Sequence, residues 1–231
     1  MLVVVTREIG RNLGLRRWLP DDATIVEAPL TETRYRPPED VNADLARASG
    51  SGRFAALVVT SARAIGYVRA ALTVCSREVL VWSVGPVTTR SLAELGVAVA
   101  GEAPSASALA ARIEYGPVLQ LGARVTRHEL RDQLTQRGIA SCSVACYETV
   151  GLAPSREVRS LLARADVVVI GAPSAWTVAR DVVARDAWVV VPGATTRDVV
   201  RADHDRVLVG WNEATGQRLA EFADERGSRG R

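Results

Sequence analysis

Residues 56–64 read ALVVTSARA, an apolar run that ends in a small polar turn and continues as a helix-like pattern. Residues 166–175, DVVVIGAPSA, repeat this arrangement near the other end of the chain. An apolar run followed by a turn and a helix is typical of a parallel α/β unit. The two stretches therefore predict two related α/β segments in one chain.

A second pair of segments supports the repeat. VGPVTTR at 84–90 and VPGATTR at 191–197 match loosely around their glycines, Gly85 and Gly193. Thr88 and Thr196 are separated by the same interval as these glycines. That interval is longer than the roughly 20 to 50 residues of a solenoid unit, so it predicts a repeated lobe. We expect the functional site in a cleft between two such lobes.

Composition limits the class of protein. The chain has 231 residues, of which 48% are hydrophobic, enough to bury two cores. No apolar run approaches the roughly 18 residues of a membrane span, and no signal-peptide pattern opens the chain, so we expect a cytoplasmic protein with no membrane partner. The net charge of +3 is spread along the chain without a basic block, which disfavours nucleic acid as a partner.

The residue types also exclude several chemistries. All 29 basic residues are arginine, so no lysine is available for a Schiff base or a phosphate-binding P-loop. Cys75, Cys142 and Cys146 form no CxxC pair, and Cys142 and Cys146 fall on one face of a predicted strand as small core residues. His128 and His204 stand alone in polar surroundings. We therefore expect no metal site and no lysine or histidine catalysis.

Strands and helices alternate along the chain, which predicts α/β lobes with parallel sheets flanked by helices. The expected strands are 2–6, 24–30, 57–60, 80–84, 118–121, 141–150, 167–170, 188–191 and 207–209. The expected helices are 12–19, 38–48, 62–73, 87–95, 106–114, 127–137, 155–164, 174–184, 195–201 and 215–224. The charged tail 224–231 is expected to fray.

Counting these units predicts a discontinuous lobe. Residues 1–30 and 152–231 each contain few strand–helix units, but together they contain as many as the middle of the chain. We therefore expect them to form lobe 1, with 38–143 inserted as lobe 2. The chain must then cross between lobes at 31–37 and at 144–151. Both segments carry Glu-Thr after an apolar strand, and we expect them to pair as a two-stranded antiparallel hinge.

The ordered set of motifs resembles the uroporphyrinogen-III synthase family. Its elements are Thr6-Arg7 after the first strand, Thr60-Ser61-Ala62, Val84-Gly85-x-x-Thr88, Cys146-Tyr147-Glu148-Thr149 and Gly193-x-Thr195-Thr196. The resemblance covers nearly the whole chain in order. It implies two α/β lobes joined by a two-stranded ladder, with a linear tetrapyrrole polycarboxylate between them. It also implies action without a metal or organic cofactor. We expect the protein to be a monomer.

The family's reaction closes hydroxymethylbilane, which carries eight carboxylates, into a ring. Loss of its hydroxyl leaves a cationic azafulvene, and the terminal pyrrole attacks through its substituted carbon to form a spiro intermediate. That intermediate fragments and recloses with the terminal ring inverted. Because the substrate would close by itself into the uninverted ring, the protein's task is to hold it so that spiro closure is the nearest attack.

The resemblance implies that the Tyr147 phenol faces the cleft and helps the hydroxyl leave. A phenol with a pKa near 10 stays protonated at neutral pH and can donate a proton to a departing oxygen. Packing at the hinge is the alternative role for this ring. The substrate carboxylates are expected at strand-to-helix turns, where helix N-termini present free N–H groups. The expected binding residues are Arg7, Ser61, Ala62, Arg63, Gly85, Thr88, Arg127, Ser174, Thr195 and Thr196.

These residues also have ordinary structural explanations. Ser61, Ser174 and the three threonines could be helix N-caps, and any one of the arginines could be a solvated surface residue. Two departures from the family pattern stand out: Gly171-Ala172 replaces the Thr60-Ser61 of the first repeat, and Glu8 follows Arg7 where a proline is usual. They leave open a non-catalytic bilobal module that binds a tetrapyrrole or another anion. A nucleotide-sugar transferase is disfavoured because the chain has no Gly-rich phosphate loop with a following acidic partner.

Overall fold

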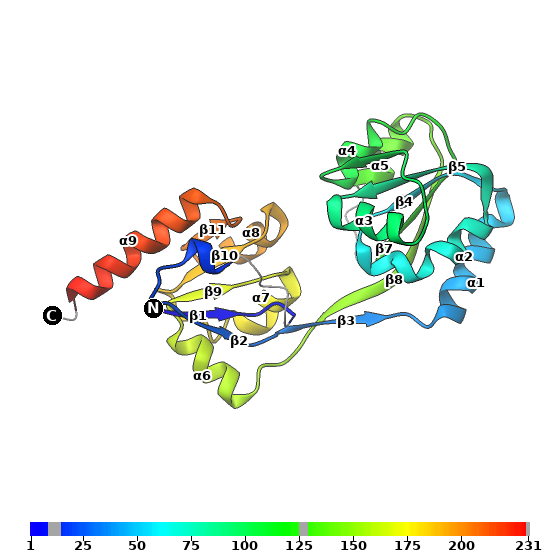
Figure 1. The fold of residues 1–231 in the computed structure, drawn as a ribbon. Coiled ribbons are helices and arrows are strands. Elements are labelled where there is room, and N and C mark those ends of the chain that lie inside the picture. Colours follow the sequence, from blue (N-terminus) through cyan, green and yellow to red (C-terminus); the bar gives the residue numbers. More distant parts are fainter. Residues whose placement is uncertain (9–14, 125–128, 230–231) are drawn as a thin grey trace. The chain divides into compact units, whose positions relative to one another are not determined.

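The computed structural model describes residues 1–8, 15–124 and 129–229. The chain divides into two compact units (Figure 1). Unit 1 consists of Met1–Glu32 and Thr149–Arg231, and unit 2 consists of Thr33–Glu148. The predicted α/β fold with parallel sheets flanked by helices is confirmed.

Unit 1 contains a five-stranded parallel sheet in the order β11-β10-β9-β1-β2. Its strands are β1 Leu2–Val5, β2 Thr24–Glu27, β9 Val167–Val169, β10 Trp188–Val191 and β11 Val207–Val209. Val3, Val4 and Val5 are fully buried, as expected for a parallel strand covered on both faces. Because β1 pairs with β9, the two ends of the sequence share one sheet.

Helices cover both faces of this sheet. They are η1 Arg16–Trp18, α6 Arg156–Arg164, α7 Pro173–Ala179, α8 Ala194–Arg201 and α9 Glu213–Arg229. Leu162, Trp176 and Val200, from α6, α7 and α8, pack in one cluster with Val4. Leu219 of α9 packs with Val3 and Val5 on the other face. The alternation of side chains along β1 therefore places one cluster on each face.

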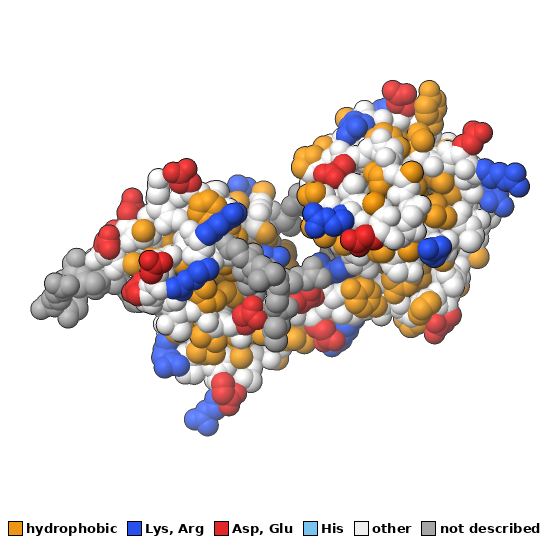
Figure 2. Space-filling view, viewed as in Figure 1, with side chains coloured by type: hydrophobic (Ala, Val, Ile, Leu, Met, Phe, Trp, Pro, Cys, Tyr) orange, Lys and Arg blue, Asp and Glu red, His pale blue; other side chains and the backbone are white. Residues whose placement is uncertain are grey.

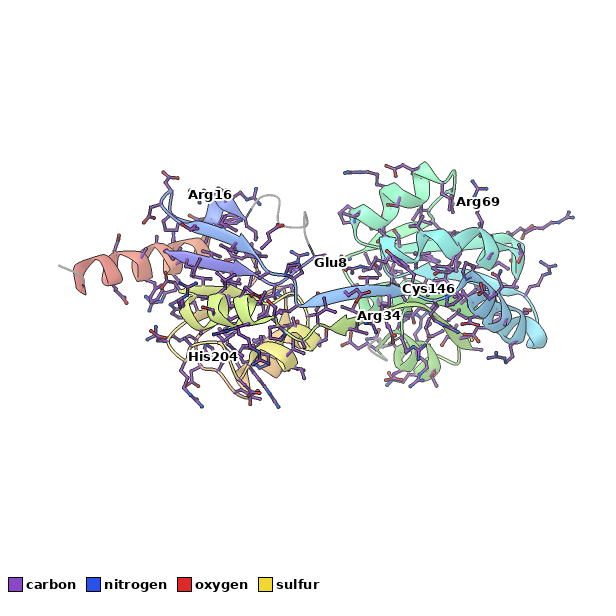
Figure 3. The ribbon with its side chains drawn as sticks, turned by 90° about the horizontal axis from the view of Figure 1, so that it is seen from below. Glu8, Arg16, Arg34, Arg69, Cys146 and His204 are labelled. Atoms are coloured by element: carbon purple, nitrogen blue, oxygen red, sulfur yellow. The ribbon has the colours of Figure 1, made fainter. Side chains whose placement is uncertain are left out.

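Unit 2 is built around a six-stranded sheet in the order β3-β8-β7-β4-β5-β6. Its strands are β3 Thr31–Tyr35, β4 Phe54–Val59, β5 Cys75–Val84, β6 Gly101–Ala103, β7 Val118–Ala123 and β8 Ser141–Gly151. The strands from β8 to β6 run parallel. Figure 3 labels Arg34 on β3 and Cys146 on β8.

The pairing of β3 with β8 is antiparallel. The Arg36 N–H donates to the Cys146 carbonyl at 3.0 Å, and the Leu152 N–H donates to the Leu30 carbonyl at 2.9 Å. From the second bond to the first, the residue number beside β3 rises from 30 to 36 while that beside β8 falls from 152 to 146. Paired strands numbered in opposite directions are antiparallel. Both strands lie where the chain passes from one unit to the other.

Helices also cover both faces of the unit 2 sheet. They are α1 Pro38–Ala48, η2 Ser49–Ser51, η3 Ala62–Tyr67, α2 Val68–Thr73, α3 Pro86–Glu94, α4 Ala106–Ala110 and α5 Glu129–Gln136. Leu57 packs with Leu45 and Leu92 on one face. Val58, its neighbour along β4, packs with Leu109 and Leu134 on the other.

Three expectations need correction. Residues 62–73 form a 3-10 helix followed by α2 rather than one α-helix. Of the helix expected at 12–19, residues 12–14 lie outside the described residues, and in the rest only Arg16–Trp18 is helical, as a 3-10 turn. The tail does not fray at Asp224, because α9 continues to Arg229. Phe222 is buried, and Arg218 forms ion pairs with Glu221 and Glu225 along the helix surface.

The surface shown in Figure 2 carries acidic and basic side chains interspersed rather than gathered by sign. Among the helices of the described ranges, none combines the length and the apolar character that a membrane span requires.

Candidate functional site

In unit 2 the predicted turns follow the ends of β4 and β5, and of the predicted site residues Tyr147 lines a pocket there. A pocket of about 320 Å³ lies at this carboxyl edge, and it is lined by Thr60, Val84, Ser105, Ala106, Gln120, Ala123, Glu129 and Tyr147. Thr60 follows β4, Val84 ends β5, and Ser105 is the N-cap of α4. Ligands of open parallel sheets bind outside the carboxyl ends of their strands, so this pocket has the position expected of a binding site.

Tyr147 forms one wall of this pocket. Its side chain is 6% exposed, and its ring centroid lies 6.3 Å from that of Tyr35. The Arg63 guanidinium lies 5.8 Å from the Tyr147 ring centroid. The Arg124 N–H donates to the Tyr147 carbonyl at 2.7 Å, just where the β7–β8 register shifts. The aromatic ring is thus held on two sides, and no described residue bonds to its hydroxyl.

The Ser61-Ala62-Arg63 turn lies beside Tyr147. Ser61 is the N-cap of η3, and its hydroxyl accepts from the Arg63 N–H at 3.2 Å, so its predicted capping role is confirmed. A second pocket, of about 580 Å³, is lined by Tyr35, Pro38, Asn42, Ala62, Arg63, Gly66, Tyr67, Arg69 and Ala70. Arg63 therefore lines this pocket and also contacts the Tyr147 ring.

The Tyr67 phenol in this second pocket has a structural role. Its hydroxyl donates to the Arg36 carbonyl at 2.6 Å. Burial raises the pKa of Tyr67, so the phenol keeps its proton and the bond persists at neutral pH.

The turn between β5 and α3 requires a glycine. Gly85 has a φ of 77°, a left-handed conformation that side chains rarely adopt, and it is the N-cap of α3. Thr88 is therefore inside the helix and 3% exposed, so its expected role as an N-cap is wrong. Its neighbour Thr89 instead bonds to the Ser83 hydroxyl at 2.7 Å and to the Glu102 carboxylate. Pro86 has no N–H and the Thr88 and Thr89 N–H groups donate to the Gly85 carbonyl, which leaves the Val87 N–H for a ligand at this edge.

In unit 1 the predicted residues also follow strand ends. Arg7 comes after β1, where Figure 3 also labels its neighbour Glu8, and Ser174 is the second residue of α7 after β9. Thr195 and Thr196 lie in the first turn of α8 after β10. None of these three hydroxyl residues is an N-cap, because Ala172 and Gly193 occupy the caps. Arg127 and His128 lie outside the described residues.

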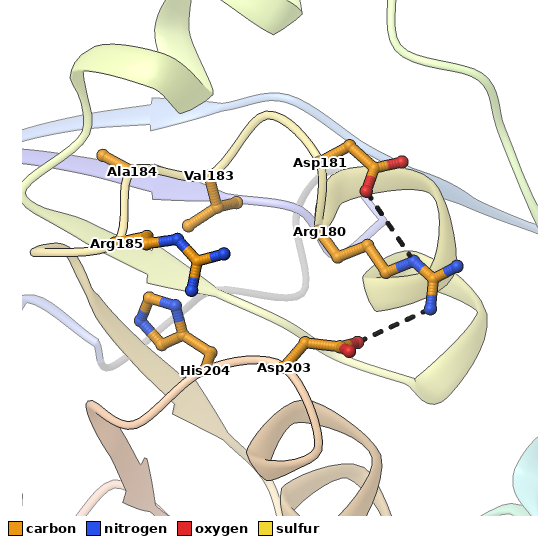
Figure 4. A pocket seen from close by; sticks show the side chains of 7 residues that line it. All are labelled: Arg180, Asp181, Val183, Ala184, Arg185, Asp203 and His204. Carbon is orange, nitrogen blue, oxygen red and sulfur yellow. Dashed lines mark ion pairs between the residues drawn. The ribbon is translucent and has the colours of Figure 1, made fainter.

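A cavity of about 710 Å³, larger than the two pockets of unit 2, lies at the opposite edge of the unit 1 sheet (Figure 4). Arg180 in its wall pairs with Asp203 at 3.5 Å and with Asp181 at 4.0 Å. His204 is not in polar surroundings as expected: it is 6% exposed, its ring packs edge-on against Trp176, and its Nε2 bonds to the Ala187 carbonyl at 2.8 Å. These residues precede β10 and β11, so the cavity is away from the carboxyl edge.

The cysteines behave as core residues. Cys75 and Cys146 are buried, and Cys142 is partly buried against the same cluster. Burial raises the pKa of Cys75 to about 11 and that of Cys146 to about 12, so both remain thiols at neutral pH. Within the described ranges, no three His, Cys, Asp or Glu side chains are grouped as a metal site would require.

Gln120 is a pocket residue that sequence reasoning missed. It is 5% exposed, and its Oε1 accepts from the Ser143 hydroxyl at 3.3 Å. The available signal was a polar residue inside the otherwise apolar strand β7. A buried amide in such a strand is costly unless it is paired or serves a ligand. Tyr35 was also missed as a neighbour of Tyr147, because their contact depends on the register of the β3–β8 pairing, which the sequence pattern does not specify.

Comparisons with known proteins bear on the family and the fold of the chain. The family model described as "Uroporphyrinogen-III synthase HemD" matches residues 21–221. A mutant uroporphyrinogen III synthase from Thermus thermophilus superposes with a TM-score of 0.61 at 15% identity, covering 99% of each chain. Uroporphyrinogen-III synthetase from Helicobacter pylori gives 0.60 at 15% identity, covering 96% of this chain and 98% of that one.

No curated protein matched the sequence. The two solved structures are too distant in sequence to show more than a shared fold. The family model spans most of the chain, from the second strand to the last helix. The chain therefore belongs to the uroporphyrinogen-III synthase family.

Proposed function

We propose that this chain cyclises hydroxymethylbilane with inversion of the terminal pyrrole, and that Tyr147 assists loss of the substrate hydroxyl. Its family consists of cyclising lyases of tetrapyrrole and heme biosynthesis. The observation that carries the assignment of Tyr147 is its place in the 320 Å³ pocket at the carboxyl edge of unit 2. Its ring is held by Tyr35 and Arg63, while no described residue bonds to its hydroxyl.

In the proposed step, the phenol donates its proton to the leaving hydroxyl oxygen. The carbon–oxygen bond breaks, water departs, and the cationic azafulvene remains. A positioned acid contributes about 100-fold or more to such steps. The Arg63 cation beside the ring stabilises the phenolate that forms. The proton returns to Tyr147 when the terminal pyrrole, after ring closure, restores its aromaticity.

Recognition of the substrate carboxylates is assigned mainly to strand-to-helix turns. The starts of α3 and α8 follow Gly85 and Gly193, and a Cβ built on either glycine would meet no heavy atom within 4 Å. The Val87 N–H at the start of α3 and the N–H groups of 194–196 at the start of α8 are therefore approachable. Helix N-termini favour anions because their free N–H groups and the helix dipole point the same way.

Side chains supplement these amides. Arg7 and Arg63 can each form paired hydrogen bonds with a carboxylate. The other proposed contacts are Ser61, Ala62, Thr88, Arg127, Ser174, Thr195 and Thr196. We further propose that the protein acts in the cytoplasm as a monomer, on a linear tetrapyrrole polycarboxylate and without a cofactor.

One observation favours a second candidate function. The turn after β9 carries Gly171-Ala172, without the hydroxyls of Thr60-Ser61 in unit 2. A non-catalytic module that only binds a tetrapyrrole would tolerate that loss.

The test separates these two functions by product. Purified protein is mixed with freshly generated hydroxymethylbilane, and the isomers are resolved after oxidation to porphyrins. A synthase gives the type III isomer. A binding module gives only the type I isomer of spontaneous closure, and that result would overturn the proposed function.

A further inference from the structure

The end of β1 is fixed against the end of β9. Both the N–H and the hydroxyl of Thr6 donate to the Val169 carbonyl, at 3.0 and 2.7 Å. Thr6 is fully buried, so these bonds are shielded from water. Directly after them, the backbone of Arg7 emerges from the sheet beside Gly171, the second residue beyond β9.

The Arg7 side chain occupies the space where a Gly171 side chain would lie. A Cβ built on Gly171 would be 2.6 Å from the Cγ of Arg7, 3.3 Å from its Cδ and 3.6 Å from its Nε. Real Cβ atoms do not approach a carbon as closely as 2.6 Å. Because Cγ is near the base of the side chain, any residue larger than glycine would force Arg7 into another rotamer.

The corresponding turn of unit 2 is built differently. Thr60, which matches Gly171 in the repeat, keeps its side chain, and its hydroxyl donates to the Leu121 carbonyl at 3.0 Å. In unit 1 the hydroxyl bond between the paired strand ends runs in the other direction, from Thr6 at the end of β1 to the Val169 carbonyl of β9. A hydroxyl at 171 is therefore not needed to satisfy the strand end, and its absence makes room for Arg7.

We propose that Gly171 is a positioning residue for Arg7: its missing side chain lets the arginine stem lie across the end of β9 and sets the guanidinium at the carboxyl edge, where it binds a substrate carboxylate. This inference rests on the proposed function. It reinterprets the Gly171 departure from the family pattern as an adaptation for substrate binding rather than a loss of the site.

A double-mutant cycle tests the proposal. Gly171→Ala and Arg7→Ala should each raise KM for hydroxymethylbilane about tenfold, as expected for loss of one charge-assisted hydrogen bond, with kcat within about twofold. The double variant should have the KM of Arg7→Ala alone, because without the arginine stem the alanine has room. Gly50→Ala is the matched control, since a Cβ there would meet nothing within 4 Å.

A spectroscopic readout locates the guanidinium independently of turnover. The Nε–H signal of Arg7, assigned by its absence in Arg7→Lys, should shift in Gly171→Ala and stay in place in Gly50→Ala. An unmoved signal, an unchanged KM in Gly171→Ala, or a further loss on adding Gly171→Ala to Arg7→Ala would each overturn the positioning role.

These results are separable from the proposed function. If the wild type forms no type III isomer, the function fails, whereas the Nε–H signal still reports on the Gly171–Arg7 packing. If the wild type does form it and the cycle shows no coupling, only the positioning role fails. If Gly171→Ala alone does not fold, the double variant is compared with Arg7→Ala. The positioning role then requires that the two proteins have the same KM and the same stability.

Discussion

The Arg63 guanidinium lies 5.8 Å from the centroid of the Tyr147 ring, within cation–π range, although Arg63 belongs to η3 and Tyr147 to β8. Arg63 is placed by the Ser61 cap of η3, and Tyr147 by the register shift between β7 and β8. Packing of a cation against a phenol favours the negative charge that the phenol acquires when it gives up its proton. This pair connects the fold of unit 2 with the proposed acid.

Replacing Tyr147 with phenylalanine should slow catalysis without unfolding the protein. We expect kcat to fall by about 100-fold or more, because the ring remains and only the acid is lost. The free energy of unfolding should change by less than about 0.5 kcal/mol, since no described residue bonds to the hydroxyl. Spontaneous closure then competes, so the type I fraction should rise. Tyr115→Phe, at a position 68% exposed, is the control; equal turnover in both variants removes Tyr147 from the mechanism.

Replacing Arg63 with methionine tests the cation beside the ring. Methionine keeps most of the apolar stem but loses the charge, so kcat/KM should fall about tenfold. Arg69 lines the same 580 Å³ pocket, and its guanidinium donates to the Leu95 carbonyl at 3.4 Å. Arg69→Met should retain wild-type kcat/KM. Equal losses in both variants would show that general positive charge, rather than contact with Tyr147, is responsible.

Replacing Gly85 with alanine should disturb the start of α3. Its φ of 77° costs a side-chain-bearing residue about 1 to 2 kcal/mol, although the added methyl meets no atom within 4 Å. We expect a loss of stability of that size in urea unfolding and a higher KM. Gly50→Ala, in a conformation open to any residue, should be neutral. Wild-type stability in Gly85→Ala would mean that the turn relaxes and that its geometry is not needed.

Stability should fall at alkaline pH because of the buried thiols. The folded pKa of Cys75 is raised to about 11 and that of Cys146 to about 12. Their contribution is complete below the unfolded pKa, near 8.5 to 9, and decreases as pH rises toward the folded values. Each thiol should lower the free energy of unfolding by about 1.4 kcal/mol per pH unit within that window.

Denaturation curves at pH 8, 9 and 10 measure this slope. Cys146→Ala should make it shallower than in the wild type, whatever the variant's stability at pH 8. Cys142→Ala, at the less buried position, should change it least. Identical slopes in all three proteins would contradict the role of the thiols.

The alternation of strands and helices was predictable because buried parallel strands such as β1 and β10 are short apolar runs. Strand β6 was not, because Gly101-Glu102-Ala103 has no apolar pattern. Its pairing with β5 depends on close approach to Trp82, whose ring would be 2.5 Å from a Cβ at Gly101. Such a requirement arises only after the chain has folded.

Part of the candidate site was predictable from local pattern. Strand-to-helix turns such as Ser61-Ala62-Arg63 are local features, so the sequence identified them. The exact start of each helix was not predictable from local pattern. The threonines were therefore expected as caps, whereas the caps are Gly85 and Gly193. Contacts between distant segments, such as Arg7 over Gly171, depend on strand order and are absent from any local pattern.

The most direct test of where the substrate binds is an amide NMR titration with uroporphyrinogen III, the reaction product, kept reduced under anaerobic conditions. Binding at the carboxyl edges predicts the largest shifts in the N–H signals of Gly85, of 87–89 and of 193–197, together with those flanking Tyr147. Shifts concentrated instead at 180–187 and 203–204, around the cavity at the opposite edge of the unit 1 sheet, would contradict the assignment.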